Sequence, residues 1–571
     1  MDTTIVPSYN EMILKSIQEH WFLDSMSDYG VFTLQYKDVA RIIEKLHILF
    51  EEAGIKPGDK IALCGRNLSR WGAAFFSVLT YGAVAVPVLH EFHPSQVHDI
   101  INHSEAKLLF VGDKVWPALN ADEMPDLLGI ISLVDYSLLV CRNEKLAYAR
   151  ENLNRLFGEK FPSRFLPELL SYYKDSPDEL AVLNYTSGTT SNSKGVMLPY
   201  RALWSNCDFA YNVLGDEIKA GDKVLSMLPM AHMYGMAFEF TFEFMRGVHV
   251  NFLTKAASPT ILMRTLAEVK PVVLIVVPLI IEKVVRKAVM PRIQDPGVRM
   301  LMQVPVIGDR IKKKICDGLT QALGGNFYEL IIGGAALNRE IEQLLHDIGF
   351  HYTVGYGATE CAPIITYNDW KEQIVGSCGK SVIHQELTID SPDPLNIPGE
   401  ILTRGLNVML GYYRDPERTR AALTDDGWFR TGDLACMDSK GRYYIKGRLG
   451  NMIVGPSGEN IYPEEIEQVI NNMRGVNESL VIERDGKLVA LVKFDENVID
   501  WGMIEKEEKF FENLESWKKA VMEYVNKRVG KQSNIGEVNA MKEDFEKTAT
   551  QKIRRFKYKS FKPEDEPEKK D

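Results

Sequence analysis

Cysteine is scarce in this chain and shows no pairing pattern. Seven cysteines occur among 571 residues, their number is odd, and no CxxC pair is present. A disulfide framework normally shows an even number of closely spaced cysteines, and structural zinc sites show CxxC pairs. The spacing therefore predicts a protein of a reducing compartment, without a disulfide scaffold.

Long hydrophobic runs are also absent. The two most apolar stretches, 73–89 and 271–281, are interrupted by Ser, Thr and Pro or are shorter than the roughly 20 residues that a membrane span needs. The first residues, MDTTIVPSYN, lack the charged and then apolar layout of a signal peptide. We expect a cytoplasmic protein with no cleaved leader. The first stretch is expected to form a buried helix with its strand, and the second a core strand.

An excess of basic residues is missing as well. The chain has 67 Lys and Arg against 78 Asp and Glu, so its formal charge is −11. Nucleic-acid-binding proteins normally carry a basic balance or stripe. We therefore expect no nucleic acid partner. No internal repeat is visible, and 45% apolar residues are enough for a large globular core.

What the chain does contain is an alternation of short β-branched runs with helical patterns. The runs KIALCG (60–65), VAVPVL and KLLFVGD flank such helices. Similar β-branched runs occur again at 269–278 and 327–337. This alternation predicts βαβ units with mostly parallel sheets. From Pro398 the sequence pattern changes to short strand-like runs separated by Gly and Asp turns, which predicts a small antiparallel unit.

These patterns predict an α/β protein of two domains. Residues 1–448 are expected to form a large N-terminal domain of stacked α/β subdomains with the small β unit. Residues 449–571 are expected to form a small mobile α+β domain, with a hairpin at Asp485-Gly486 and a charged, helical remainder. The tail from about 561 has too few apolar residues to pack and is expected to be disordered.

One segment, Tyr185 to Gly195, concentrates hydroxyls, glycines and a lysine between two apolar runs. Its sequence, YTSGTTSNSKG, offers hydroxyls and backbone amides to phosphate oxygens, and Lys194 adds a positive charge. It is not a Walker A loop, because Ser193 and Gly195 stand where Gly and Ser or Thr are required. A polyphosphate site is one interpretation, and an ordinary polar surface loop is the other.

Three further segments carry groups that suit a nucleotide. Gly355 to Glu360 (GYGATE) offers an aromatic face, a hydroxyl and a carboxylate suited to Mg²⁺. Thr431-Gly432-Asp433 offers a carboxylate for two ribose hydroxyls, and Tyr444 to Arg448 adds a guanidinium. Each could instead be a tight turn or a surface salt bridge. Their order along the chain favours the nucleotide.

In that order the sequence resembles the adenylate-forming superfamily of acyl-CoA synthetases, peptide adenylation domains and beetle luciferases. The resemblance extends from about Thr33 to Arg555. The segments that carry it are YTSGTTSNSKGVML, LPMAHMYG (228–235), IIGGAAL, GYGATE, GWFRTGDL, YIKGRLGN, GENIYPEEIE and KTATQKIRR (547–555).

The resemblance implies an ATP site and a role for each matched residue. A mobile phosphate loop would run from Ser187 through Gly188, Thr189 and Thr190 to Lys194, with Thr189 and Lys194 at the β and γ phosphates. Thr186, just before the loop, would also contact the nucleotide. Adenine would lie among Ala335, Tyr356, Gly357, Ala358 and Ile445. The α phosphate would meet Thr359, and Mg²⁺ would bind Glu360 with Thr189. The ribose diol would meet Asp433, and Arg448 would assist at the ribose or at a phosphate. His232 would line the acyl site unless it is a core histidine, and Lys552 would bridge the carboxylate and the α phosphate.

By the same resemblance the C-terminal domain would swing after adenylation and withdraw Lys552, and the segment 455–463 would line a tunnel for coenzyme A. Some residues depart from the family pattern. Gly450 stands at the hinge where Lys or Asp is usual, Ser191 and Ser193 replace a common Gly and Pro, and Gln551 replaces a Gly. These changes bear on loop dynamics and not on the reaction.

Within the superfamily, the segments 270–287 and 311–345 look most like long-chain fatty acyl-CoA ligases. The expected function is ATP-dependent activation of a carboxylic acid, then transfer to CoA. Such an enzyme could touch the inner membrane surface peripherally to collect its substrate. Two alternatives stay open: loading of a carrier protein, and a noncatalytic binding protein of the same fold. Chain length, oligomeric state and pathway are not specified by the sequence.

Overall fold

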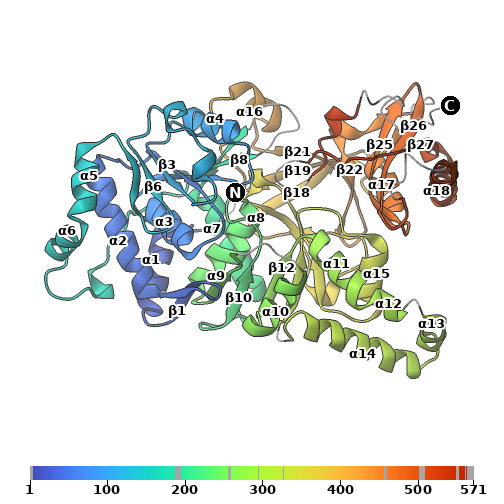
Figure 1. Ribbon diagram of the computed structural model, residues 1–571, viewed down its shortest axis with the longest axis horizontal. Coiled ribbons are helices and arrows are strands. Elements are labelled where there is room, and N and C mark those ends of the chain that lie inside the picture. Colours follow the sequence, from blue (N-terminus) through green and yellow to red (C-terminus); the bar gives the residue numbers. More distant parts are fainter. Residues whose placement is uncertain are drawn as a thin grey trace.

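The structure is a computed structural model of the 571-residue chain. It describes residues 4–186, 194–254, 259–293, 295–325, 327–455, 459–499, 508–547, 552–559 and 561. Figure 1 shows the N-terminal helices and sheets at the left and centre, and the C-terminal strands and helices at the upper right.

An eight-stranded sheet organises the first part of the chain. Its order is β20-β9-β8-β4-β3-β5-β6-β7, and the inner pairs β8-β4, β4-β3, β3-β5 and β5-β6 are parallel. The predicted βαβ units are therefore confirmed. The strands are β3 (Lys60–Cys64), β4 (Val84–Val88), β5 (Leu108–Val111), β6 (Gly129–Ser132), β7 (Leu138–Cys141), β8 (Leu180–Thr186), β9 (Lys194–Pro199) and β20 (Gly411–Tyr412). The neighbouring helices are α1 (Tyr9–Glu19), α2 (Tyr36–Ala53), α3 (Ser69–Thr80), α4 (Pro94–Ser104), α5 (Glu144–Glu151), α6 (Leu153–Lys160) and α7 (Tyr200–Leu214).

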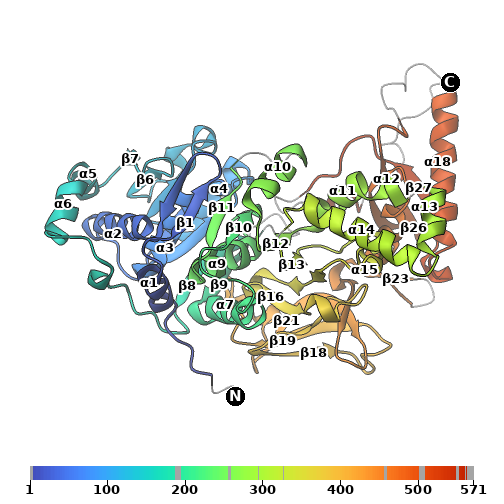
Figure 2. The same ribbon diagram turned by 90° about the horizontal axis from the view of Figure 1, so that it is seen from below.

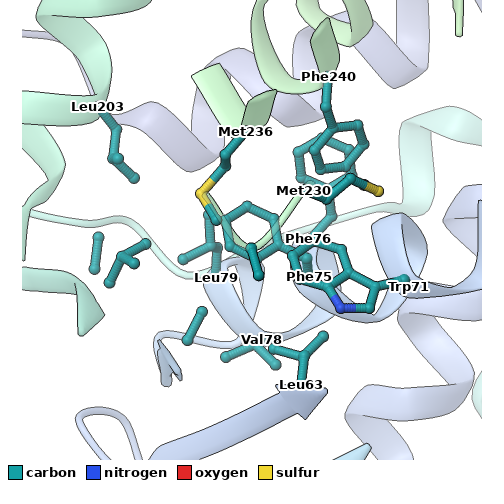
Figure 3. Packing of buried hydrophobic residues seen from close by; sticks show 14 of the residues in the cluster. Leu63, Trp71, Phe75, Phe76, Val78, Leu79, Leu203, Met230, Met236 and Phe240 are labelled. Atoms are coloured by element: carbon teal, nitrogen blue, oxygen red, sulfur yellow. The ribbon is translucent and has the colours of Figure 1, made fainter. Parts of the chain in front are cut away.

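The buried helix predicted within 73–89 is α3, followed by strand β4. Trp71 stacks on Phe75 with ring centroids 5.5 Å apart, and Phe76 lies 4.7 Å from Phe240 of a π-helical turn, Ala237–Thr241. Figure 3 shows these rings packed between the helices and β3. A Cβ on Gly72 would lie 2.8 Å from the Met26 sulfur, so glycine allows this close approach.

Two smaller sheets and a helical layer follow. The mixed sheet β10-β11-β1-β2 adjoins the parallel sheet β12-β13-β14. The predicted core strand at 271–281 is only partly right, because the strand ends at Val276 and Pro278 begins a helix, where its missing N–H costs nothing. The strands are β1 (Asp24–Asp28), β2 (Phe32–Gln35), β10 (Lys223–Ser226), β11 (His249–Phe252), β12 (Val273–Val276), β13 (Glu329–Ile332) and β14 (Tyr352–Val354). The helices are α8 (Met233–Met236), α9 (Phe242–Met245), α10 (Pro259–Val269), α11 (Pro278–Ala288), α12 (Met290–Ile293), α13 (Pro296–Met302), α14 (Ile307–Ala322) and α15 (Arg339–Asp347).

The predicted antiparallel unit is present and begins earlier than Pro398. Its four strands run in the order β18 (Gln385–Asp390), β19 (Gly399–Gly405), β21 (Phe429–Met437) and β22 (Tyr443–Arg448). A three-stranded sheet of β15 (Tyr356–Gly357), β16 (Ile364–Tyr367) and β17 (Lys380–Ser381) contacts it through β17 and β18, and both sheets lie in the lower part of Figure 2. Helix α16 (Pro416–Ala422) precedes β21.

The C-terminal part has a hydrophobic core of its own, centred on residues such as Ile466, Val492 and Val521. The predicted hairpin is confirmed: Asp485 and Gly486 have φ of +50° and +72°, the left-handed conformation that a type I′ turn requires. The elements are β23 (Ile453–Val454), β24 (Asn460–Ile461), α17 (Pro463–Asn471), β25 (Val476–Arg484), β26 (Lys487–Phe494), α18 (Glu508–Asn526) and β27 (Ile535–Ala540).

One prediction for this part is wrong. The remainder after the hairpin is not only helical, because Ile535–Ala540 forms strand β27, which runs parallel to β26. Its inner residues Ile535, Val538 and Ala540 are buried in the core. The domain boundary near residue 449 stays a prediction, and residues 562–571 of the predicted tail lie outside the described ranges. None of the helices in those ranges has the length and apolar content that crossing a bilayer requires.

Candidate active site

The centre of the candidate site is an acidic residue held by two neighbours. Strands β21 and β22 place Asp433 opposite Arg448, and Arg448 Nε donates to Asp433 Oδ1 at 2.9 Å. Tyr356, from β15, donates its hydroxyl to Asp433 Oδ2 at 2.7 Å. Each carboxylate oxygen keeps a further lone pair, so the pair of oxygens can still accept from a vicinal diol.

Burial and charge oppose one another at this carboxylate. Asp433 is buried, which raises its pKa, while the Arg448 guanidinium and the Tyr356 hydroxyl act in the lowering direction. In return, the Asp433 charge raises the pKa of Arg448. The two predicted ribose contacts therefore form one preorganised unit.

The segment 355–360 turns sharply to present its carboxylate. Ala358 N donates to Pro363 O at 2.9 Å, and a Cβ on Gly357 would meet that same carbonyl oxygen at 2.1 Å, so only glycine fits there. The 3-10 turn Thr359–Cys361 follows, and Glu360 accepts a hydrogen bond from Tyr412. The Tyr412 hydroxyl lies 2.9 Å from Glu360 Oε1.

Lys194 contacts the ring of the same tyrosine. It begins β9, opposite Thr186 at the end of β8, and its Nζ is 5.1 Å from the centre of the Tyr412 ring. This is within cation–π range. The predicted phosphate-loop residues between them, Ser187, Gly188, Thr189 and Thr190, lie outside the described residues. The predicted metal contact of Thr189 lies outside them too.

The remaining predicted contacts line the same cavity. Ala335, just after β13, is exposed to it, and so is Ile445 of β22. His232 caps the N-terminus of α8, where its Nδ1 accepts from Tyr234 N at 3.3 Å. Burial, with a smaller contribution from the Lys552 charge, lowers the pKa of His232 to about 4, so the ring is neutral at pH 7.

Lys552 arrives from the C-terminal part and lines this cavity as well. Its pKa is lowered by loss of water contact and by the Arg448 charge, while the charges of Asp433 and Glu360 raise it. More than a hundred residues separate Lys552 from Arg448 in the sequence. The structure thus brings Lys552, the predicted site residue nearest the C-terminus, into the same cavity as Thr186 and Lys194, the ones nearest the N-terminus.

Sequence reasoning missed the residues that anchor Lys552. Glu467 of α17 is buried, accepts from Val481 N at 2.6 Å, and forms a salt bridge with Arg555, three residues after the lysine. Burial raises the pKa of Glu467 to about 7, and the Arg555 charge opposes this. Both lie inside quoted motifs, GENIYPEEIE and KTATQKIRR, but nothing in either segment pairs them. Tyr412 was missed in the same way, within GYYRD.

The cavity has a volume of ≈ 1620 Å³ and two unlike ends. One end carries the charged and polar groups described above. The other end is apolar and lies among α7, the turn Ala237–Thr241 and strands β12 and β13. Its lining includes Phe209, Val213, Leu214, Phe238, Phe242 and Ile275.

A family model described as AMP-binding enzyme matches residues 19–413. The chain belongs to the AMP-binding enzyme family. The predicted superfamily is thus confirmed: the chain is an enzyme of the adenylate-forming acid–CoA ligase family.

The curated relatives include several long-chain ligases. A long-chain-fatty-acid–CoA ligase of Mycobacterium bovis is 27% identical over 450 residues, which cover 75% of this chain and 72% of the relative. A chloroplastic long-chain-fatty-acid–[acyl-carrier-protein] ligase of Arabidopsis thaliana is 28% identical over 535 residues, covering 80% and 72%.

Solved structures share the fold. An anthranilate CoA ligase in complex with anthranoyl-AMP has a TM-score of 0.76 at 18% identity, covering 98% of each chain. ATP-bound MatB from Rhodopseudomonas palustris has a TM-score of 0.73 at 20% identity, covering 97% of this chain and 99% of the other. The predicted α/β fold class is confirmed by these likenesses.

Proposed function

We propose that this protein is an ATP-dependent long-chain fatty acid–CoA ligase. It activates the acid as acyl-AMP with release of pyrophosphate and then transfers the acyl group to CoA. The observation that carries the proposal is the single cavity with Asp433, Glu360 and Lys552 at one end and an aromatic and aliphatic lining at the other. The relatives named as long-chain ligases support the choice of acid.

The apolar end suits an alkyl chain because each methylene taken out of water there contributes about 0.8 kcal/mol. Phe209, Phe238 and Phe242 belong to its aromatic lining. His232 lines the same cavity and its pKa is affected by the charge of Lys552, so its neutral ring places no second charge beside the substrate carboxylate. An acid with its carboxylate at Lys552 would extend its tail toward α7.

In the first half-reaction the acid's carboxylate attacks the α phosphate of ATP, and two anions must meet. Lys552, placed between them, offsets the charge that builds on the phosphoryl oxygens. Asp433 and Arg448 hold the ribose, while Tyr356 and Ile445 flank the base, so that the reacting atoms start aligned. Lys194 faces the departing pyrophosphate. Thr359 hydrogen bonds the α phosphate.

Magnesium fits the polar end. Tyr412 occupies only one lone pair of Glu360 Oε1, so this carboxylate can still serve a hard cation that binds one or two carboxylates together with substrate phosphates. When bound, the ion would neutralise phosphate charge. Glu360 would hold it, with Thr189 as the second predicted protein contact.

In the second half-reaction the CoA thiol displaces AMP from the acyl-AMP. We propose that the C-terminal part then moves about Gly450, which withdraws Lys552 and lets the segment 455–463 line the path of the pantetheine arm. Residues 456–458 of that segment lie outside the described residues. A Cβ on Gly450 would meet nothing within 4 Å, so the backbone there is free of side-chain contacts.

The test is to incubate the purified chain with ATP, Mg²⁺, CoA and acids from acetate to oleate, and to measure pyrophosphate and thioester separately. Both products with long acids are expected. If neither pyrophosphate nor thioester forms with any acid, the proposal is overturned and a noncatalytic binding protein is favoured.

A carrier protein is tested as a second acceptor in a parallel assay, because one relative is named as a ligase for an acyl-carrier protein. Phosphopantetheinylated carrier protein replaces CoA in this arm. Pyrophosphate release with acyl transfer only to the carrier protein would assign that acceptor instead of CoA.

A further inference from the structure

Helix α4 ends against the strands that flank the proposed phosphate loop. His103, its next-to-last residue, has its Nδ1 2.7 Å from the hydroxyl oxygen of Tyr185 on β8. Glu105 follows the helix with φ of +58°, the left-handed conformation that closes a helix end, so α4 stops where His103 meets β8. His103 and Glu105 lie outside every segment that carried the family resemblance.

Tyr185 lies beside the backbone that carries Lys194. It precedes Thr186 on β8 and pairs with Gly195, the residue after Lys194 on β9. Its ring covers Gly195 so closely that a Cβ there would lie 3.1 Å from the ring carbon Cζ. Gly195 O also accepts from Tyr413 N at 2.8 Å. A shift of the Tyr185 ring would therefore displace the backbone of β9 at Lys194.

The hydrogen bond between Tyr185 and His103 has a defined direction. Burial raises the pKa of Tyr185, so its hydroxyl keeps its proton and donates. Partial burial and the charge of Arg414 lower the pKa of His103, while the charges of Glu105 and Asp415 act in the raising direction. The His103 ring is therefore neutral at pH 7, and its Nδ1 accepts.

The end of α4 also holds the segment after β20. The His103 ring meets the Tyr413 ring edge to face, with centroids 5.7 Å apart. Glu105 accepts from the Tyr413 hydroxyl at 2.9 Å. The residue before Tyr413 is Tyr412, whose ring Lys194 contacts. The contacts of α4 thus reach Lys194 through both β8 and β20.

We infer that His103 is a positioning residue for the phosphate end of the site. Its hydrogen bond to Tyr185 fixes the strands from which Lys194 reaches the β and γ phosphates of ATP. His103 acts through Tyr185, because Tyr185 lines the cavity and His103 does not. The inference rests on the proposed role of Lys194 and adds the group outside the cavity that holds it in place.

The test compares ATP with AMP, because AMP has the same base, ribose and α phosphate but lacks the two phosphates that Lys194 would meet. Dissociation constants are measured by calorimetry with Mg²⁺ and without acid or CoA. In His103→Leu, ATP binding should weaken about 3- to 10-fold, the range for one lost hydrogen bond between uncharged groups, whereas AMP binding should stay within about twofold. A purely structural role would weaken the binding of both nucleotides alike.

Two further changes test whether the hydrogen bond itself is responsible. His103→Asn places an amide oxygen near the position of Nδ1, so ATP binding should return to within about twofold of the wild type. Tyr185→Phe removes the donor and keeps the ring. Combined with His103→Leu, it should cost no more than the larger of the two single changes, because both break the same bond.

The matched control is His98→Leu on the same helix. His98 Nε2 accepts from Asn120 N at 3.1 Å, so this change also removes a histidine acceptor from α4, but away from β8. The variant should bind ATP and AMP like the wild type.

Three results would overturn the inference. The first is unchanged ATP binding in His103→Leu. The second is equal weakening of ATP and AMP binding, which would assign His103 to the stability of the fold. The third is additive loss in the double variant, which would mean that the two residues act independently. Because the assay contains neither acid nor CoA, a chain that binds ATP but forms no thioester would fail the proposed ligase reaction and would still decide this inference.

Discussion

The two parts of the chain contribute to the active site in different ways. The N-terminal part supplies the proposed nucleotide wall, in which Asp433 is buried and is bound by Arg448 at 2.9 Å and by Tyr356 at 2.7 Å. The C-terminal part supplies one lysine, Lys552, and holds it indirectly through the salt bridge of Arg555 with Glu467. The proposed binding groups are thus fixed by strand pairing, whereas the position of the proposed catalytic lysine depends on how the C-terminal core is placed.

The largest expected effect comes from removing that charge. Lys552→Ala should reduce pyrophosphate release by about 10²- to 10³-fold, because a positioned cation opposite the developing charge is lost. ATP binding, measured by calorimetry, should change little. Lys557→Ala, which breaks a surface pair with Glu546 on the same segment, is the control. Equal loss of activity in both variants would contradict the proposed role.

The next effect tests the nucleotide wall. Asp433→Asn leaves Arg448 without its charged partner and removes one acceptor for the ribose, so the KM for ATP should rise about 10- to 100-fold, as when a hydrogen bond to a charged group is lost. Glu386→Gln, which breaks an exposed pair with Arg404 in the same sheet, should leave KM unchanged. A fall in kcat at constant KM in Asp433→Asn would assign this residue to chemistry instead of binding.

The sequence predicts the two halves of this site unequally. Asp433 and Arg448 lie 15 positions apart on strands joined by a short turn, so their meeting follows from local pairing. The turn at 355–360 is equally local. Nothing local brings Glu467 to Arg555, because that contact needs α17 and the segment after β27 to pack in three dimensions.

Strand β27 shows the same limit in the fold. Its apolar residues Ile535, Val538 and Ala540 are few and are separated by Gly, Glu and Asn, so the periodicity is weak. The strand forms because the exposed edge of β26 and the core around Val492 give those side chains a place to be buried. The central parallel sheet was predictable because both of its faces are buried and its strands are continuous apolar runs.

A smaller effect should separate placement from charge. Glu467→Gln keeps the shape but weakens the hold on Arg555, so adenylation should fall about tenfold, within the range for a displaced catalytic group. Since the pKa of Glu467 is raised to about 7, the wild type holds this carboxylate charged above pH 7 and protonated below it. Wild-type adenylation should therefore decline as the pH falls through 7, and the Gln variant should lack that step.

The same titration predicts a stability change of known sign. The folded chain binds a proton at Glu467 up to about pH 7, whereas the unfolded chain releases it near the ordinary glutamate value. This group therefore favours folding below the ordinary value and loses that contribution as the pH rises through 7. Thermal unfolding of Glu467→Gln should show a smaller pH dependence between 5 and 7 than the wild type. Identical curves would contradict the assignment.

The smallest effect is expected at Gly450, between the two parts. Its φ is not in the left-handed region and a Cβ there would touch nothing, so Gly450→Ala fits without strain. Adenylation should stay within about twofold, because the wall and Lys552 are unchanged, and stability should rise by about 0.4–1 kcal/mol through the unfolded chain. Thioester formation should slow by a few-fold if backbone rotation at this residue carries the motion between half-reactions. An equal change in both half-reactions would place the hinge elsewhere and leave Gly450 with a purely local role.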